Sequence, residues 1–217
     1  MAATEEYFDL LPLGLDPATK AVTAPSGASK ALHAELAALN NLHRSILTLE
    51  VSPQIPPPPI PVNPKRSAQI TKLKDGGNDF YRKGKHGEAL KMYHLGITMA
   101  LGRPLWEPQG LVREEVSQLF ANRAQAHMAL QNWAEGAVDA EASVEAKRAG
   151  NAKAWWRRGK CLLEMGRLDE AHEWVGHGLE MEGEEQELLA LQQEVVARLE
   201  KKSQREEAVI KAGGEKA

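Results

Sequence analysis

The sequence contains very little cysteine, few aromatic residues and no long apolar run. Its single cysteine, Cys161, excludes an internal disulfide framework and a multi-thiolate zinc site, and it fits a reducing cytosolic setting. Aromatic residues make up only 5% of the 217 residues, which favours a helix-rich protein over an aromatic-rich β-sandwich. No apolar run approaches the roughly 18 residues that span a bilayer, and the acidic residues 1–6 do not resemble a signal peptide. We therefore expect no direct membrane insertion.

The charges are nearly balanced, with a formal net charge of -3. This excludes binding of bulk polyanions, and the local basic cluster of Arg157, Arg158 and Lys160 lacks the aromatic platform typical of nucleic-acid binding. His172 and His177 are five residues apart, which places them about 140° apart around a helix and does not fit the zinc-protease motif. We expect no metal, no cofactor, no nucleic acid and no catalytic residue.

Prolines divide the chain into an N-terminal arm and a larger body. Seven of the 12 prolines lie between Pro53 and Pro64, so this stretch is expected to form neither a helix nor a central strand. We expect a proline-rich linker or strap over residues 53–65, with an SH3 or WW ligand as the alternative. The other predicted segments are the arm, the repeats and the C-terminal part, at residues 1–52, 66–183 and 184–217.

The body repeats one pattern of helix, tight turn and helix three times. Small residues recur at equivalent positions, where we expect the two helices of one unit to approach closely. They group as Gly77 with Ala89 and Gly96, Ala124 with Gly136 and Ser143, and Gly159 with Ala171 and Gly178. The step from Ala124 to Gly159 is close to the period of about 34 residues in tetratricopeptide repeats.

This body resembles the tetratricopeptide repeat family over residues 69–183. The first repeat carries the family pattern at Leu73, Gly77, Phe80, Ala89 and Tyr93. His127 and Gly136 depart from it, which makes the second repeat the weakest, whereas Trp155 and Trp156 are expected to pack between repeats. The resemblance implies an all-α fold of three helix pairs in a right-handed solenoid.

A helical solenoid needs a cap over its last apolar face, and the C-terminal segment supplies one. Apolar residues form one broad stripe at Leu188, Leu189, Leu191, Val195, Val196 and Leu199. After about Glu200 the apolar positions thin out, so residues 201–207 are expected to be a solvated or frayed end.

Candidate binding residues lie on the first helix of each repeat, which lines a concave groove in such a stack. Lys74 and Asn78 are four residues apart in the first repeat, and Lys153 and Arg157 are four apart in the third, so each pair shares a helix face. Asn122 lies in the first helix of the second repeat. Amides and cations donate hydrogen bonds, and carboxylates accept them, so this set can hold two carboxylates close together.

These five positions resemble the dicarboxylate clamp of co-chaperone tetratricopeptide domains. The resemblance implies binding of the Glu-Glu-Val-Asp C-terminal tail of a cytosolic heat-shock chaperone. Lys74, Asn78 and Asn122 would hold the main-chain carboxylate, and Lys153 and Arg157 would face mainly the aspartate side chain. The alternative is that all five are solvated surface residues.

The arm is more apolar than a free tail requires. Its candidate docking residues are Tyr7, Phe8, Leu10 and Leu11, followed by Leu36, Leu39 and Ile46 on a predicted amphipathic helix over residues 29–49. About fifty residues do not bury such a stripe by themselves. We expect the arm to pack on the repeats, on another protein, or on both.

The whole layout of arm, proline-rich strap, clamp repeats and cap resembles the fungal tetratricopeptide subunits of the Sec post-translational translocation complex. That resemblance implies a non-catalytic adaptor at the cytosolic face of the endoplasmic reticulum membrane. A small membrane-anchored translocon-complex subunit would hold it there, and it would receive chaperones of the seventy-kilodalton class with their precursor proteins. Two alternatives stay open: a freely cytosolic co-chaperone with the same clamp, and a scaffold that binds an internal peptide without a free carboxylate.

Overall fold

The structure is a computed structural model that describes residues 11–47 and 62–214, with side chains up to residue 208. Within these ranges the chain forms eight helices and one short β-hairpin. Contacts divide it into two units, which we call the arm (residues 11–47) and the repeat body (residues 62–103 and 108–214). Tyr7, Phe8, Leu10 and most of the predicted proline-rich strap lie outside the described residues.

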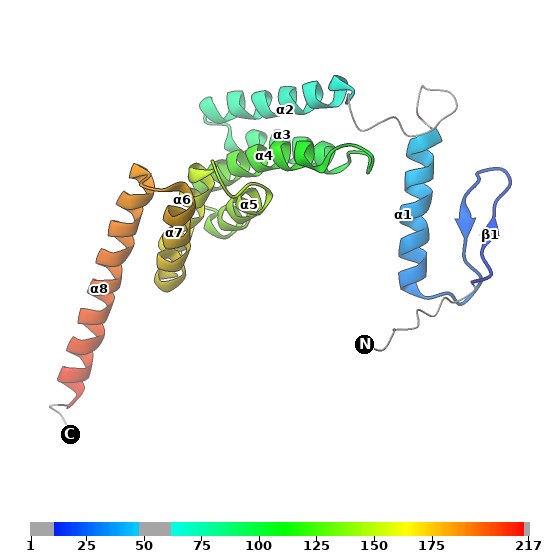
Figure 1. Cartoon of the computed structure of the whole chain (residues 1–217). Coiled ribbons are helices and arrows are strands. Elements are labelled where there is room, and N and C mark those ends of the chain that lie inside the picture. The colour runs from blue at the N-terminus through cyan, green and yellow to red at the C-terminus, as the bar shows by residue number, and fades with distance from the viewer. Residues whose placement is uncertain (1–10, 48–61, 215–217) are drawn as a thin grey trace, which may run out of the picture. The chain divides into compact units, whose positions relative to one another are not determined.

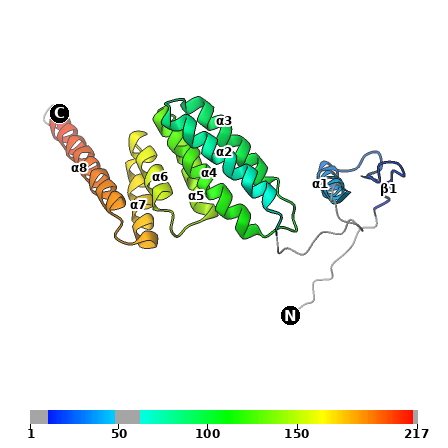
Figure 2. The same cartoon turned by 90° about the horizontal axis from the view of Figure 1, so that it is seen from above.

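The repeat body consists of three helix pairs and one further helix (Figure 1). The pairs are α2 (Pro64–Arg82) with α3 (His86–Leu101), α4 (Gln109–Ala129) with α5 (Trp133–Ala146), and α6 (Ala152–Glu164) with α7 (Leu168–Glu182), followed by α8 (Gln186–Gly214). Each helix packs against the next, and Figure 2 shows them following one another from α2 to α8. The predicted all-α architecture of helix pairs with a terminal helix is confirmed.

The first helix of the repeat body, α2, begins inside the segment that the sequence assigned to the proline-rich strap. The Asn63 side chain accepts a hydrogen bond from the backbone N–H of Lys65 and caps α2. Pro64 follows at the first helical position, where the missing N–H costs nothing and the fixed φ already suits a helix. Pro64 therefore starts the body rather than ending the linker.

The tight turn inside each helix pair uses a left-handed backbone conformation at the same position. Gly84 has a φ of 71° and Gly166 a φ of 73°, whereas the second repeat has Gln131 there with a φ of 59°. Glycine adopts this conformation without steric cost, but a residue with a Cβ pays for it. The second repeat therefore departs from the family pattern at its turn, in addition to the departures at His127 and Gly136.

The repeat body is held together by two apolar clusters that run through successive helices. One is built on α2, α3 and α4 and contains Tyr93 and Leu119, and the other extends from α4 to α8 and contains Trp155 and Val175. The small residues that the sequence singled out do allow neighbouring side chains to approach closely. At Gly77, for example, an added Cβ atom would lie 2.4 Å from the Tyr93 ring and would clash with it.

Gly96 differs from its predicted role as a contact within one repeat. A Cβ there would lie 2.9 Å from Leu119, which belongs to the first helix of the next repeat. Gly96 therefore provides space for packing between repeats.

The helix α8 covers the end of the second cluster. Leu188, Leu191 and Val195 are buried, whereas Leu189 is exposed and Val196 and Leu199 are half-buried. The part from Lys201 onward is solvated, with residues 201–208 all exposed, yet it continues the helix. Figure 1 shows this part projecting from the body as the end of α8.

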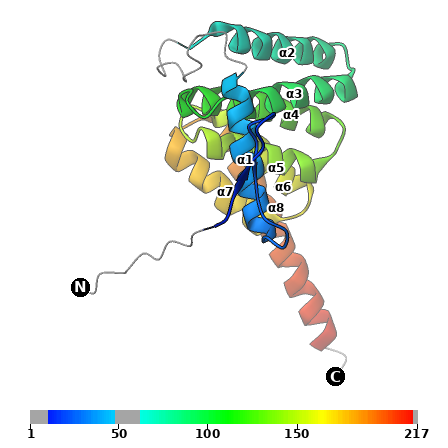
Figure 3. The ribbon, with the colours of Figure 1, turned by 90° about the vertical axis from the view of Figure 1, so that its right-hand side faces the viewer.

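The arm combines a small β-hairpin with one helix (Figure 3). The strands β1 (Gly14–Leu15) and β2 (Val22–Thr23) pair antiparallel, and α1 (Lys30–Leu47) contacts β2. Asn40 on α1 forms two hydrogen bonds of 2.8 Å with the backbone N–H and carbonyl of Val22, as a neighbouring strand would. The sequence reasoning missed this hairpin.

The predicted docking residues of the arm do not share one environment. Leu36 is only 7% exposed, so it is not available to a partner. Leu11 and Leu39 are exposed, and Ile46 is half-buried. Of the predicted set, the described arm thus offers mainly Leu11 and Leu39.

Candidate peptide-binding groove

The first helices of the three repeats bring the predicted clamp residues to one concave surface. Lys74 and Asn78 come from α2, Asn122 from α4, and Lys153 and Arg157 from α6. All of them line a single cavity of about 450 Å³. We call this cavity the groove.

A buried tyrosine fixes the orientation of the two amides. The Tyr93 hydroxyl donates to Asn78 Oδ1 at 2.8 Å, and Asn122 Nδ2 donates to the same oxygen at 3.1 Å. Burial raises the pKa of Tyr93 to about 12, so the hydroxyl keeps its proton and remains a donor. Because Oδ1 of Asn78 is engaged in this way, its amide nitrogen is left to donate into the groove.

The two groove lysines of the predicted clamp are held differently. Lys74 Nζ donates to Oε1 of Gln118 on α4 at 2.8 Å. Lys153 is exposed and has no hydrogen bond or ion pair with any residue that the structure describes. A neutral amide therefore accepts a hydrogen bond from the Lys74 ammonium group, whereas the Lys153 ammonium group has no hydrogen-bond partner among the described residues.

Arg157 is the most deeply placed residue of the set, at 8% exposure. Its guanidinium donates to the backbone carbonyl of Ala121 at 2.9 Å and to Gln125 Oε1 at 2.8 Å, which ties α6 to α4. Burial lowers the pKa of Arg157 from its ordinary value. Both acceptors are neutral, so the buried positive charge has no hydrogen-bonded carboxylate opposite it.

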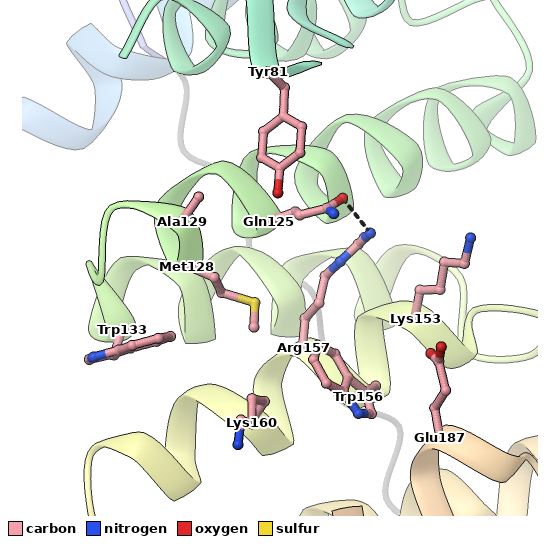
Figure 4. A pocket seen from close by; sticks show the side chains of 10 residues that line it. All are labelled: Tyr81, Gln125, Met128, Ala129, Trp133, Lys153, Trp156, Arg157, Lys160 and Glu187. Atoms are coloured by element: carbon pink, nitrogen blue, oxygen red, sulfur yellow. Dashed lines mark hydrogen bonds between the residues drawn. The ribbon is translucent and has the colours of Figure 1, made fainter. Parts of the chain in front are cut away.

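A second cavity of about 530 Å³ adjoins the groove and shares Gln125, Lys153 and Arg157 with it. Figure 4 shows Tyr81, Gln125 and Arg157 pointing toward one another there. The rest of the lining is mixed. Met128, Ala129, Trp133 and Trp156 are apolar or aromatic, and Lys160 and Glu187 are charged. The cavity provides space for an apolar side chain next to the charged groove.

The two tryptophans of α6 have different surroundings. Trp155 is buried, and its ring centroid lies 4.4 Å from that of Trp174 on α7, which is a contact within the third repeat and not the predicted contact between repeats. Trp156 packs partly on the core but also lines the second cavity. The sequence reasoning missed its place at the site. Neighbouring residues of one helix face different directions, and two adjacent tryptophans give no signal for which of them faces the core and which faces the cavity.

The sequence reasoning also missed several polar residues of the groove, and Glu114, Gln118 and Lys147 are among them. The signal for two of them was present, since Glu114, Gln118 and Asn122 are spaced by four residues and so share one face of α4. Lys147 follows the end of α5 and carries no comparable spacing signal.

The described residues contain neither a metal site nor a membrane span. No group of three histidine, cysteine, aspartate or glutamate side chains within them is placed to hold a metal ion. None of their helices is long and apolar enough to cross a bilayer. Burial raises the pKa of the Cys161 thiol to about 12, which leaves it without nucleophilic character at neutral pH.

Helix pairs of this kind, stacked through small residues and lined on one side by their first helices, define a tetratricopeptide-type repeat protein. No family model matches the chain. The chain belongs to the family of the ER protein translocation subcomplex subunit sec67 of Schizosaccharomyces pombe. The two are 37% identical over 143 residues, which cover 65% of this chain and 74% of that protein. The family is non-enzymatic.

Two solved structures show the same fold. A chain of the Sec complex from S. cerevisiae, determined by cryo-EM, matches with a TM-score of 0.70 and 24% identity, over 87% of this chain and 98% of that one. The second TPR domain of human RPAP3, solved in complex with the HSP70 peptide SGPTIEEVD, matches with a TM-score of 0.51 and 25% identity. That match covers 60% of this chain and 97% of the domain.

Proposed function

We propose that the groove binds the free C-terminus of an acidic tail of a cytosolic heat-shock chaperone of the seventy-kilodalton class. The observation that carries this proposal is the convergence of Lys74, Asn78, Asn122, Lys153 and Arg157 on one cavity. Such a set donates hydrogen bonds from several directions and suits a ligand that only accepts them. Each charge-assisted bond is offset by desolvation and by ordering of the tail, so we expect micromolar affinity.

The residues divide into two groups in this proposal. Lys74, Asn78 and Asn122 hold the main-chain carboxylate, and Tyr93 keeps the amide of Asn78 turned toward it. Lys153 and Arg157 hold the side-chain carboxylate of the terminal aspartate. Arg157 exchanges its neutral acceptor Gln125 for a charged one, and hydrogen bonds to charged acceptors are the stronger kind.

We further propose that the chain is a non-catalytic adaptor at the cytosolic face of the endoplasmic reticulum membrane. The support is its family, together with its likeness in fold to a chain of the Sec complex. When the chain is held at this membrane, its groove raises the local concentration of chaperones that carry precursor proteins for post-translational translocation. Binding becomes in effect intramolecular, so a micromolar contact is sufficient.

The arm is the proposed contact to a small membrane-anchored subunit of the translocon complex. Leu11 and Leu39 are exposed apolar residues of the arm, and Leu13, Leu15 and Leu47 extend the apolar surface. Tyr7, Phe8, Leu10 and Ile46 complete the proposed docking set. Leu36 is left out of it because it is buried.

A peptide titration tests the groove. We expect a fluorescent peptide that ends in Glu-Glu-Val-Asp to bind with micromolar Kd, and Lys153→Ala to weaken binding about tenfold or more. Lys201→Ala is the matched control, because it removes the same charge from an exposed position of α8. Equal affinities of wild type and Lys153→Ala would contradict the proposed clamp.

Cell fractionation tests the location. The full chain is expected in the membrane fraction, and a variant that lacks residues 1–52 in the soluble fraction with its peptide affinity unchanged. Recovery of the full chain in the soluble fraction alone would instead support a freely cytosolic co-chaperone with the same clamp.

A further inference from the structure

One carboxylate of the chain itself lies in the groove. Glu114 lines the same cavity as the proposed clamp residues and lies on the face of α4 that carries Asn122. Its side chain is about half exposed. A negative charge therefore stands in a cavity that otherwise gathers positive charges and amide groups.

Glu114 engages two of the groove lysines, one directly and one through Gln118. Lys147 Nζ donates to both of its carboxylate oxygens, at 2.9 and 3.2 Å. Gln118 Nε2 donates to Glu114 Oε1 at 2.9 Å, and Gln118 Oε1 accepts from Lys74 Nζ at 2.8 Å. The hydrogen bonds from Lys147 and from Gln118 lower the pKa of Glu114, so it stays ionised at neutral pH.

We propose that Glu114 is a built-in competitor of the ligand, which occupies Lys147 and, through Gln118, Lys74, and repels an incoming acidic tail. The inference rests on the proposed function, because it assumes that the groove binds carboxylates. Its consequence is specificity. A tail with only the terminal carboxylates reaches Lys153 and Arg157, neither of which is paired with a carboxylate of the described residues, whereas each additional acidic residue near Glu114 meets a like charge. Weak binding with fast release follows from the same competition.

The contrast with Lys153 supports this assignment. Lys153 carries the same charge in the same cavity and has no partner among the described residues, whereas Lys147 is paired across the groove. Exposed pairs of this kind contribute little to folding, so the Glu114–Lys147 pair is not needed for the fold. Its position in the groove gives it an effect on binding that an ordinary surface pair does not have.

The test is the peptide titration with Glu114→Gln, which keeps the shape of the side chain and removes its charge. We expect the Kd for the Glu-Glu-Val-Asp peptide to fall about three- to tenfold at low salt, with the gain shrinking at high salt as charges are screened. The matched control is Glu145→Gln, which removes the same charge from an exposed position outside the groove and should leave the Kd unchanged.

Lys153→Ala, made in both backgrounds, separates failure of the inference from failure of the proposed function. If Glu114→Gln leaves the Kd unchanged while Lys153→Ala still weakens binding, Glu114 is no competitor and the clamp stands. An equal gain in Glu145→Gln would also overturn the inference, because the effect would then be one of net charge. If Lys153→Ala changes nothing in either background, the clamp itself is wrong.

Discussion

The repeat body and the arm differ in how far each buries its own apolar residues. In the described residues, every buried apolar side chain except Leu36 belongs to the repeat body. The arm leaves Leu11, Leu13, Leu15, Leu39 and Leu47 exposed, although its helix carries a regular apolar stripe. The body thus has an apolar core of its own, although it also exposes apolar residues such as Leu95 and Val138, whereas the described arm buries only one apolar side chain.

The largest expected difference between the two regions comes from shortening one leucine in each. Leu119→Ala empties a fully buried site between repeats and should lower the free energy of unfolding by about 2–5 kcal/mol. Leu39→Ala removes an exposed side chain and should change it by less than about 0.5 kcal/mol. Urea unfolding followed by far-ultraviolet circular dichroism, which reports the helices of both regions, measures both. Similar losses of stability in the two variants would contradict the difference in apolar burial between the body and the arm.

A smaller effect is expected from filling a close contact in the body. A Cβ on Gly159 would lie 2.5 Å from Val175 and 2.9 Å from Leu191, so Gly159→Ala should cost about 1–3 kcal/mol of stability. Gly176→Ala is the control, since nothing lies within 4 Å of its Cβ and alanine favours a helix by up to about 1 kcal/mol. Thermal unfolding should show opposite shifts in Tm. Two shifts of the same sign would argue against tight packing at Gly159.

In the arm, the corresponding test removes the side chain that holds the hairpin. Asn40→Ala deletes two hydrogen bonds to Val22, worth about 1 kcal/mol each, and should speed amide hydrogen exchange at Val22. The unfolding midpoint of the body should not move. Asn41→Ala is the neighbouring control, because Asn41 bonds only to Arg44 within the described residues. Unchanged exchange at Val22 would mean that the hairpin is held by something else.

The smallest expected effect is a gain in stability from a substitution in the turn of the second repeat. Gln131→Gly relieves a left-handed backbone that Gly84 and Gly166 adopt without strain, and should stabilise the body by about 0.5–1 kcal/mol. Gly166→Gln should destabilise by a similar amount. Urea midpoints measure both changes. A loss of stability in Gln131→Gly would show that the glutamine side chain contributes more than its backbone costs.

The fold of the body could be predicted because its signals are local. Turn residues such as Gly84 and Gly166 and small residues such as Gly77 recur at the same offsets within each repeat. The packing partner of Gly96 could not be predicted, because it depends on how one repeat stacks on the next. The hairpin was missed because its strands have two residues each and a helix side chain, Asn40, fixes one of them.

For the groove as well, spacing within one helix could be predicted from the sequence, whereas contacts between helices could not. Four-residue spacing places Lys74 with Asn78 and Lys153 with Arg157, and the structure gathers both pairs in one cavity with Asn122. The burial of Arg157 against Ala121 and Gln125 follows from packing between α4 and α6, which no spacing within one helix reveals. The pairing of Glu114 with Lys147 joins residues far apart in sequence and depends on how α4 packs against α5.

The central claim is that the groove recognises a free terminal carboxylate. The most direct measurement compares the Kd of the Glu-Glu-Val-Asp peptide with that of its C-terminally amidated twin, which has the same sequence and lacks the terminal charge. The account predicts that amidation weakens binding about tenfold or more, because Lys74, Asn78 and Asn122 lose the acceptor that they were arranged to hold. Equal affinity for the acid and the amide would contradict it and favour a scaffold that binds internal peptides.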